Sequence, residues 1–109
     1  MAEGAHFVQV NVNPGVCGFE CVIKAWHHEA RMVKVAISES QCQHIQRMSA
    51  HLRQMTLNEL FVPVPRNPAF VSATEAGCHS SCPVPVAVLK AAEVAMGMAL
   101  PKDVHIRFL

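Results

Sequence analysis

Three runs of alternating side chains in the first third of the chain constrain its fold more than any other feature. Residues 7–12 place valines on one side and polar residues on the other, and residues 19–26 and 33–37 repeat this two-residue period. The period is typical of strands that bury one face of a sheet. Because residues 28–30 interrupt the pattern between the second and third runs, we expect those two runs to form an antiparallel hairpin.

Two later segments have helical spacing. Residues 39–55 follow a capping-box pattern that begins at Ser38 or Ser40, and their apolar side chains fall on one stripe of a helix. That stripe comprises Cys42, Ile45, Met48, Leu52 and Met55. A second helix is predicted over residues 83–96, with Gly97 at its C-terminal end. Since this second helix is apolar nearly all round, it must be covered on more than one side, by self-association or by an overlying loop.

The rest of the chain completes the predicted fold. Residues 62–81 contain three prolines and Gly77, which predict a connection of about twenty residues without a long helix. Residues 104–108 alternate again and predict a last strand. The sequence therefore predicts an α+β fold, a two-layer sandwich in which a small, mostly antiparallel sheet of about four strands is covered by two helices. We expect residues 1–109 to form this single domain.

Composition narrows the range of functions. With 109 residues, of which 51% are hydrophobic and 16% charged, the chain can bury a core without metal or disulfide support. A formal net charge of +1 offers no electrostatic attraction for nucleic acid or for an anionic membrane. No window approaches the ~18 apolar residues of a membrane helix, and residues 1–6 lack the features of a signal sequence. We therefore expect a cytoplasmic protein whose partners are neither nucleic acids nor membranes.

Five cysteines in so short a chain suggest chemistry based on thiols. In a reducing cytosol they are expected to be metal ligands, reactive thiols or buried apolar residues rather than disulfides. The metal hypothesis takes four thiols as ligands of a zinc ion or an iron–sulfur cluster and two neighbours as substitutes. The four ligands are Cys17, Cys21, Cys42 and Cys82, and the substitutes are Cys78 and His79. Such a protein would act as a carrier or accessory rather than as a stand-alone enzyme.

Cys82 is singled out by its position directly before the second predicted helix. The free N–H groups and partial positive charge at a helix N-terminus lower the pKa of a thiol and favour its thiolate form. Cys82 is therefore expected to be the most reactive thiol of the metal-free protein.

The run Cys82-Pro83-Val84-Pro85, with the helix and strand that follow it, resembles the C-P-x-P motif of the small sulfur-carrier proteins that relay persulfide sulfur in tRNA thiolation. This resemblance implies that Cys82 carries the sulfur and is the catalytic residue. The chain as a whole, through residues 13–19 and 79–85, also resembles a group of short uncharacterised cysteine-containing proteins of anaerobic microbes. That second resemblance implies no activity.

Three hypotheses thus stay open: a cysteine-ligated metal or iron–sulfur protein, a sulfur-transfer protein that uses Cys82, and an oligomeric domain with buried thiols and no cofactor. The first requires several thiols to converge in space, whereas the second requires Cys82 alone. In each of them, the second predicted helix is the expected surface for a protein partner or for self-association.

Overall fold

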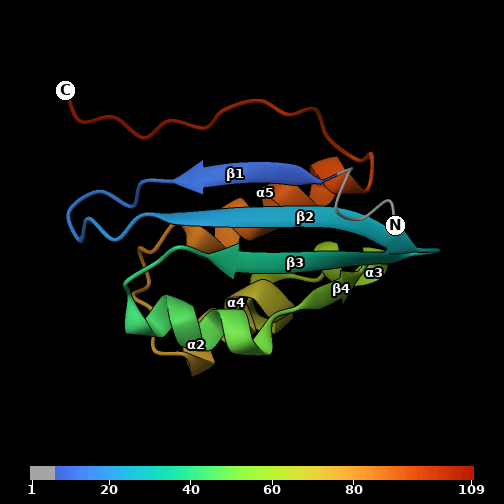
Figure 1. Ribbon diagram of the computed structural model, residues 1–109, viewed down its shortest axis with the longest axis horizontal. Helices are drawn as coiled ribbons and strands as arrows, with labels where there is room; N and C mark the ends of the chain where they lie inside the picture. Colours follow the sequence, from blue (N-terminus) through green and yellow to red (C-terminus); the bar gives the residue numbers. More distant parts are fainter. Residues whose placement is uncertain (1–6) are drawn as a thin grey trace.

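The alternating segments form one antiparallel sheet, which Figure 1 shows in a computed structural model that describes residues 7–109. The strands lie in the order β1-β2-β3-β4, and each pairs antiparallel with the next. Their bounds are β1 Val8–Val12, β2 Cys21–Glu29, β3 Met32–Ser38 and β4 Gln54–Thr56. The predicted hairpin of the second and third strands is confirmed. Residues 1–6, in which we read no signal sequence, lie outside the described part of the chain.

One face of the sheet packs against the helices and contributes its side chains to the hydrophobic core. Val10 pairs with Ile23, which in turn pairs with Ile37, so apolar side chains stand side by side on this inner face. Ile23 is fully buried, and Val33 and Met55 are equally buried where β3 pairs with β4. The other face is only partly covered, as in antiparallel sheets that pack on one side.

Within residues 7–109, four α-helices and a short 3-10 helix accompany the sheet. They are α2 Gln43–His51, α3 Leu57–Leu60, the 3-10 helix η1 Val64–Arg66, α4 Pro68–Glu75 and α5 Val84–Ala95. α5 packs on the inner face of β1, β2 and β3, while α4 contacts α5 and α2 contacts β3 (Figure 1). The predicted α+β class, with an antiparallel sheet covered by helices, is confirmed. No helix of this region is long and apolar enough to cross a membrane.

The apolar character of α5 is explained by its position. Its buried residues pack in the core against the sheet and the neighbouring helices, and they are Val84, Pro85, Val88, Ala91 and Ala92. The helix ends in a Schellman motif, in which Gly97 N–H donates to the Val94 carbonyl at 3.0 Å and Met98 N–H donates to the Glu93 carbonyl at 2.8 Å. Gly97 has φ +75°, so the predicted glycine end of this helix is confirmed.

The first predicted helix, residues 39–55, is too long. Residues 43–51 are helical, but residues 54–56 form β4, where Met55 pairs with Val33. An apolar residue at position 55 fits the buried face of a helix and also a short buried strand, so the apolar pattern alone does not distinguish helix from strand here.

The capping box is also at a different place from the one we predicted. α2 has Cys42 as its N-cap and no side-chain capping bond, so neither Ser38 nor Ser40 begins a capping box there. A complete capping box forms instead at the start of α3, where Glu59 N–H donates to the Thr56 hydroxyl and Thr56 N–H donates to the Glu59 carboxylate.

The predicted loop over residues 62–81 contains η1 and α4. Pro68 does not break a helix here but occupies the first position of α4. A residue at this position makes no hydrogen bond through its N–H within the helix, so proline, which lacks an N–H, is tolerated. Asn67 is buried before it and accepts a hydrogen bond from Ala69 N–H at 3.0 Å. Its amide nitrogen donates back to the carbonyls of Glu59, Leu60 and Val62. These bonds explain how a proline-rich segment holds a fixed helix.

The predicted strand over residues 104–108 is wrong. The segment has no regular structure and pairs with no strand of the described sheet. Its alternating apolar side chains are exposed, with exposed fractions of 58% for Val104, 84% for Ile106 and 96% for Phe108. The alternation is typical of a strand, but among residues 7–109 its backbone pairs with no other strand.

Candidate thiol site

The turn between β1 and β2 carries Cys17 and leads to Cys21. Gly15 N–H donates to the Asn13 side chain at 3.1 Å, and Gly18 N–H donates to the Gly15 carbonyl at 2.9 Å, so the chain reverses tightly. Gly15 and Gly18 have φ values of +92° and +72°, which favour glycine. Cys17 is exposed in this turn, whereas Cys21 is buried as the first residue of β2.

Cys42 lies at the start of α2, soon after the end of β3. Its backbone N–H donates to the Ser40 hydroxyl at 3.1 Å, and its carbonyl accepts the first bond of the helix from Gln46 N–H at 3.0 Å. The side chain is half-buried and caps no backbone group. The sulfur is therefore available to the other thiols.

Cys78 is placed by the end of α4. Cys78 N–H donates to the Ala73 carbonyl at 2.9 Å and Gly77 N–H donates to the Thr74 carbonyl at 3.1 Å, which is again a Schellman motif. Gly77 has φ +83°, and a Cβ added to it would lie 3.1 Å from the His44 ring. The position of the half-buried Cys78 therefore depends on glycine at residue 77.

Cys82 is placed by a turn before α5, because its N–H donates to the His79 carbonyl at 3.0 Å. The Val84 N–H donates a hydrogen bond to the Cys82 sulfur, as expected for a residue at a helix start. A further hydrogen bond joins the side chains of Cys82 and Cys78. The two thiols of this short connection are therefore neighbours.

The cysteines interact with one another although they come from separate parts of the chain. We call them the thiol cluster: Cys17, Cys21, Cys42, Cys78 and Cys82. Cys21 interacts electrostatically with Cys82 and Cys42. Cys78 interacts with the same two residues, Cys82 and Cys42. Cys82 also interacts with Cys17. Figure 1 shows why: the β1–β2 turn and the start of α2 lie at the same end of the sheet.

Burial and repulsion between neighbouring thiols raise the pKa of Cys21 and Cys78. Burial, followed by repulsion from Cys82 and Cys42, raises the pKa of Cys21 from its ordinary value of 9.0 to about 11. Burial first, and then the same two thiols, raise the pKa of Cys78 to about 11, although the Arg47 guanidinium lowers it. Two effects disfavour the ionised form of a buried thiol: the thiolate loses its hydration, and neighbouring thiolates repel its negative charge.

The pKa of Cys82 is raised, which contradicts the expectation that the start of α5 would lower it. Burial is the largest cause, and repulsion from Cys17 and Cys42 acts in the same direction. The hydrogen bonds from Val84 and Cys78 favour the thiolate but are outweighed. A helix start activates a thiol only when the sulfur stays hydrated enough to carry charge.

The thiols of the cluster do not surround a common centre at which a metal ion could bind. Within residues 7–109, no group of three or more Cys, His, Asp or Glu side chains is close enough together to hold a metal ion in this conformation. The exposed turn with Cys17 has room to change, since a Cβ added at Gly15 or Gly18 would meet nothing within 4 Å.

Sequence reasoning missed His44 and Arg47, which flank the cluster on α2. Arg47 donates to the Ala76 carbonyl at 3.0 Å through Nη2 and at 3.3 Å through Nε, and its Nη2 lies 2.7 Å from His44 Nδ1. The ring centroids of His44 and His79 are 6.2 Å apart. The three-residue spacing of His44 and Arg47 places both on one helix face, but nothing in the sequence indicates that α4 ends against that face.

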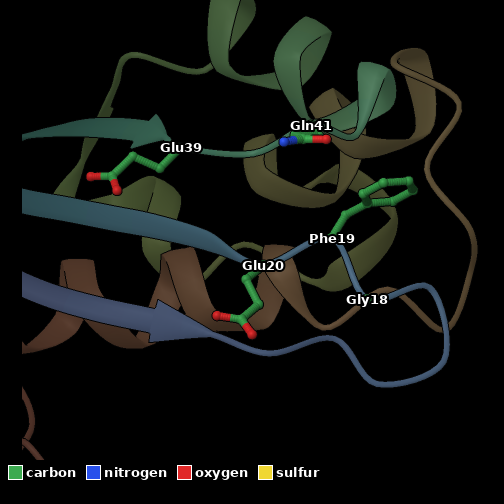
Figure 2. Close-up of a pocket in the computed structure, with 5 residues that line it drawn as sticks. All are labelled: Gly18, Phe19, Glu20, Glu39 and Gln41. Atoms are coloured by element: carbon green, nitrogen blue, oxygen red, sulfur yellow. The ribbon is translucent and has the colours of Figure 1, made fainter.

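An open pocket of about 360 Å³ lies beside the start of β2. Figure 2 shows its lining residues, which are Gly18, Phe19, Glu20, Glu39 and Gln41. The carboxylates of Glu20 and Glu39 point to different sides, while Phe19 and Gln41 project on the side away from them. The two carboxylates are thus not paired for acid–base chemistry, and the thiol cluster is the better candidate site.

Comparisons with known proteins give a family but no activity. A family model matches residues 8–108, nearly the whole chain, so the protein belongs to this family of unknown function, DUF6951. No curated protein matches the chain. No solved structure matches it.

Proposed function

We propose that this protein binds a thiophilic metal ion or an iron–sulfur cluster through Cys17, Cys21, Cys42 and Cys82, with Cys78 or His79 as a substitute ligand. The observation that carries the proposal is that thiols from separate chain segments interact electrostatically, with the β1–β2 turn and the start of α2 at the same end of the sheet. Sulfur ligands select zinc, copper(I) and iron–sulfur centres over hard cations. The role that fits is that of a cytoplasmic carrier or accessory protein rather than of a stand-alone enzyme.

An open arrangement is compatible with a metal-free thiol site that closes when a cation binds. Protonated thiols need no counter-charge, whereas several thiolates at this spacing would repel one another. A bound cation removes that repulsion and replaces the thiol protons, so the sulfurs can approach. The exposed turn that carries Cys17 is the part of the cluster with the most room to close.

Metal binding is tested on protein purified anaerobically and analysed for metal and for acid-labile sulfide. Adding Co²⁺ to the metal-free protein should give thiolate-to-cobalt charge-transfer bands together with the d–d bands of a tetrahedral site. Zinc titration in buffers of different ionisation enthalpy should release about one proton per cysteine ligand, because zinc binding replaces the proton of each thiol that becomes a ligand.

Cys17→Ser and Cys42→Ser should each weaken zinc binding by at least about tenfold, since each removes a ligand from a different segment. His51→Ala is the matched control, because His51 lies at the opposite end of α2 from Cys42 and should leave binding unchanged. A protein that holds no metal or labile sulfide, and that gives no cobalt–thiolate bands, would contradict the proposal.

Sulfur transfer by Cys82 is the second candidate, and the hydrogen bond from Val84 N–H to its sulfur favours it. In that reaction the Cys82 thiolate attacks the outer sulfur of a donor persulfide, forms a new S–S bond and releases the donor thiolate. Mass spectrometry after incubation with a persulfide donor should then show one added sulfur on Cys82. Because the reaction needs Cys82 alone, Cys17→Ser and Cys42→Ser should leave it intact, which distinguishes it from metal binding.

A further inference from the structure

The C-terminal tail, residues 100–109, has the pattern of a strand but lies outside both layers of the fold. Figure 1 shows it as a long extended trace after α5. Every residue of the tail is exposed, and Val104, Ile106 and Phe108 alternate with His105 and Arg107. Extended segments with exposed apolar side chains on every second residue are poorly soluble unless they pair with a sheet.

The tail belongs to the domain and is not an appendage to it. The family model extends through residue 108, so it includes this alternating segment together with the sheet and the helices. A strand-like pattern inside the domain therefore needs a structural explanation.

The same chain also has a free sheet edge. β1 pairs only with β2, so among the described residues nothing pairs with its outer edge. This edge has none of the usual protection, because β1 contains no proline and no charged residue. Its backbone N–H and C=O groups are available to another strand.

The inner-face side chains of β1, which lie next to that edge, are not completely buried. Val8 and Val10 are only half-buried, although their partners on β2, Ala25 and Ile23, are fully buried. A strand added beside β1 would cover this apolar surface with its own inner-face side chains.

We infer that the tail of one chain adds a fifth strand to the β1 edge of a second copy, in a reciprocal exchange of two tails. Val104, Ile106 and Phe108 then face the helix layer beside Val8 and Val10, while His105 and Arg107 remain on the outer face.

A second copy is the occupant that uses both features at once. Among residues 7–109, each chain has one unpaired β1 edge and one unpaired tail, so a two-fold exchange pairs the β1 edges of both chains. Within residues 7–109 of one chain, every tail residue is exposed and no strand pairs with the outer edge of β1. After Pro101 and the bond from Lys102 N–H to the Leu100 carbonyl at 3.0 Å, the tail turns back and runs on the β1 side of the sheet in the view of Figure 1.

The test measures the mass of the full chain by light scattering over a range of concentrations, together with amide hydrogen exchange of β1. The intact protein should be a dimer with protected β1 amides. A chain that ends at Lys102 should be a folded monomer whose β1 edge exchanges quickly, and since every residue of the tail is exposed, circular dichroism should show an unchanged fold. Ile106→Lys should dissociate the dimer at least about tenfold more readily, whereas Arg107→Ala, its outward-facing neighbour, should not.

Three results would overturn the inference. A dimer that survives removal of the tail would place self-association elsewhere, with α5 as the next surface to test. A monomer whose β1 protection depends on the tail would mean that the tail pairs within its own chain. A monomer with unprotected β1 amides would mean that the edge stays free. A synthetic peptide of residues 102–109 gives an independent check, because it should split the dimer if the tail is the exchanged strand.

Discussion

Alkaline pH should destabilise this protein through Cys21, and the effect can be worked out from its burial. Cys21 is only 2% exposed, and burial followed by the Cys82 and Cys42 thiols raises its pKa from 9.0 to about 11. Above pH ~9 the unfolded chain loses this proton while the folded chain keeps it, so the free energy of unfolding falls as pH rises. The loss is about 1.4 kcal/mol at pH ~10 and approaches 2.7 kcal/mol, or roughly 1.4 kcal/mol per unit of pKa, above pH ~11.

The measurement is urea unfolding under reducing, metal-free conditions at about pH 7.5 and about pH 10. Lysines also titrate in this range, so the quantity of interest is the difference between the wild type and Cys21→Ala. The wild type should lose about 1.4 kcal/mol more than the variant between the two pH values. Val16→Ala is the control, because Val16 is an exposed residue of the same turn without a titratable side chain, so its substitution should leave the pH dependence unchanged. Equal losses for the wild type and Cys21→Ala would refute the argument that burial holds this proton.

Three further predictions concern the segments that support the thiols. Asn67→Ala removes a cap and a buried amide that contacts three carbonyls, so it should lower the free energy of unfolding by about 2–4 kcal/mol; a loss below 1 kcal/mol would mean that water replaces these bonds. Gly77→Ala should lower it by about 1–2 kcal/mol, because φ is +83° and the new Cβ meets the His44 ring; an unchanged stability would show that α4 can end differently. In an alkylation time course at pH ~8, Cys17 should be labelled first and Cys78 roughly a hundredfold more slowly than an ordinary thiol of its exposure, because its pKa is about 11; mass spectrometry that finds Cys78 labelled first would contradict this.

Local pattern predicted the central elements of the fold well. The alternation over residues 7–37 identified β1, β2 and β3, and the glycine after residue 96 identified the end of α5, since both signals depend on neighbouring residues only. The sequence pattern gave wrong predictions where one residue type is compatible with two kinds of secondary structure. Met55 fits a helical stripe and a buried strand equally, and Pro68 both ends one element and begins another. Strand-like residues 104–108 were misassigned because pattern describes a side chain's preference and not the presence of a partner.

The candidate site was harder to predict than the fold. Sequence spacing could identify the cysteines but not their surroundings, and the pKa of a thiol depends on both. Cys82 does lie at a helix start, yet burial reverses the shift that this position would give in water. Arg47 influences Cys78 only because α4 ends against α2, a contact between segments far apart in the chain.

The way in which the thiol cluster is assembled also sets the order of events in the protein's maturation. Cys17 and Cys21 are made early in synthesis, whereas Cys78 and Cys82 emerge only with the last third of the chain. The cluster therefore does not exist on a partly synthesised chain, and it forms only when α5 has docked on the sheet and closed the longest loops of the fold. Any ligand must then be delivered after folding, to a finished surface. Once bound, it would link the two ends of the chain and oppose the detachment of α5, so that the loaded protein would resist local opening and proteolysis more than the empty one.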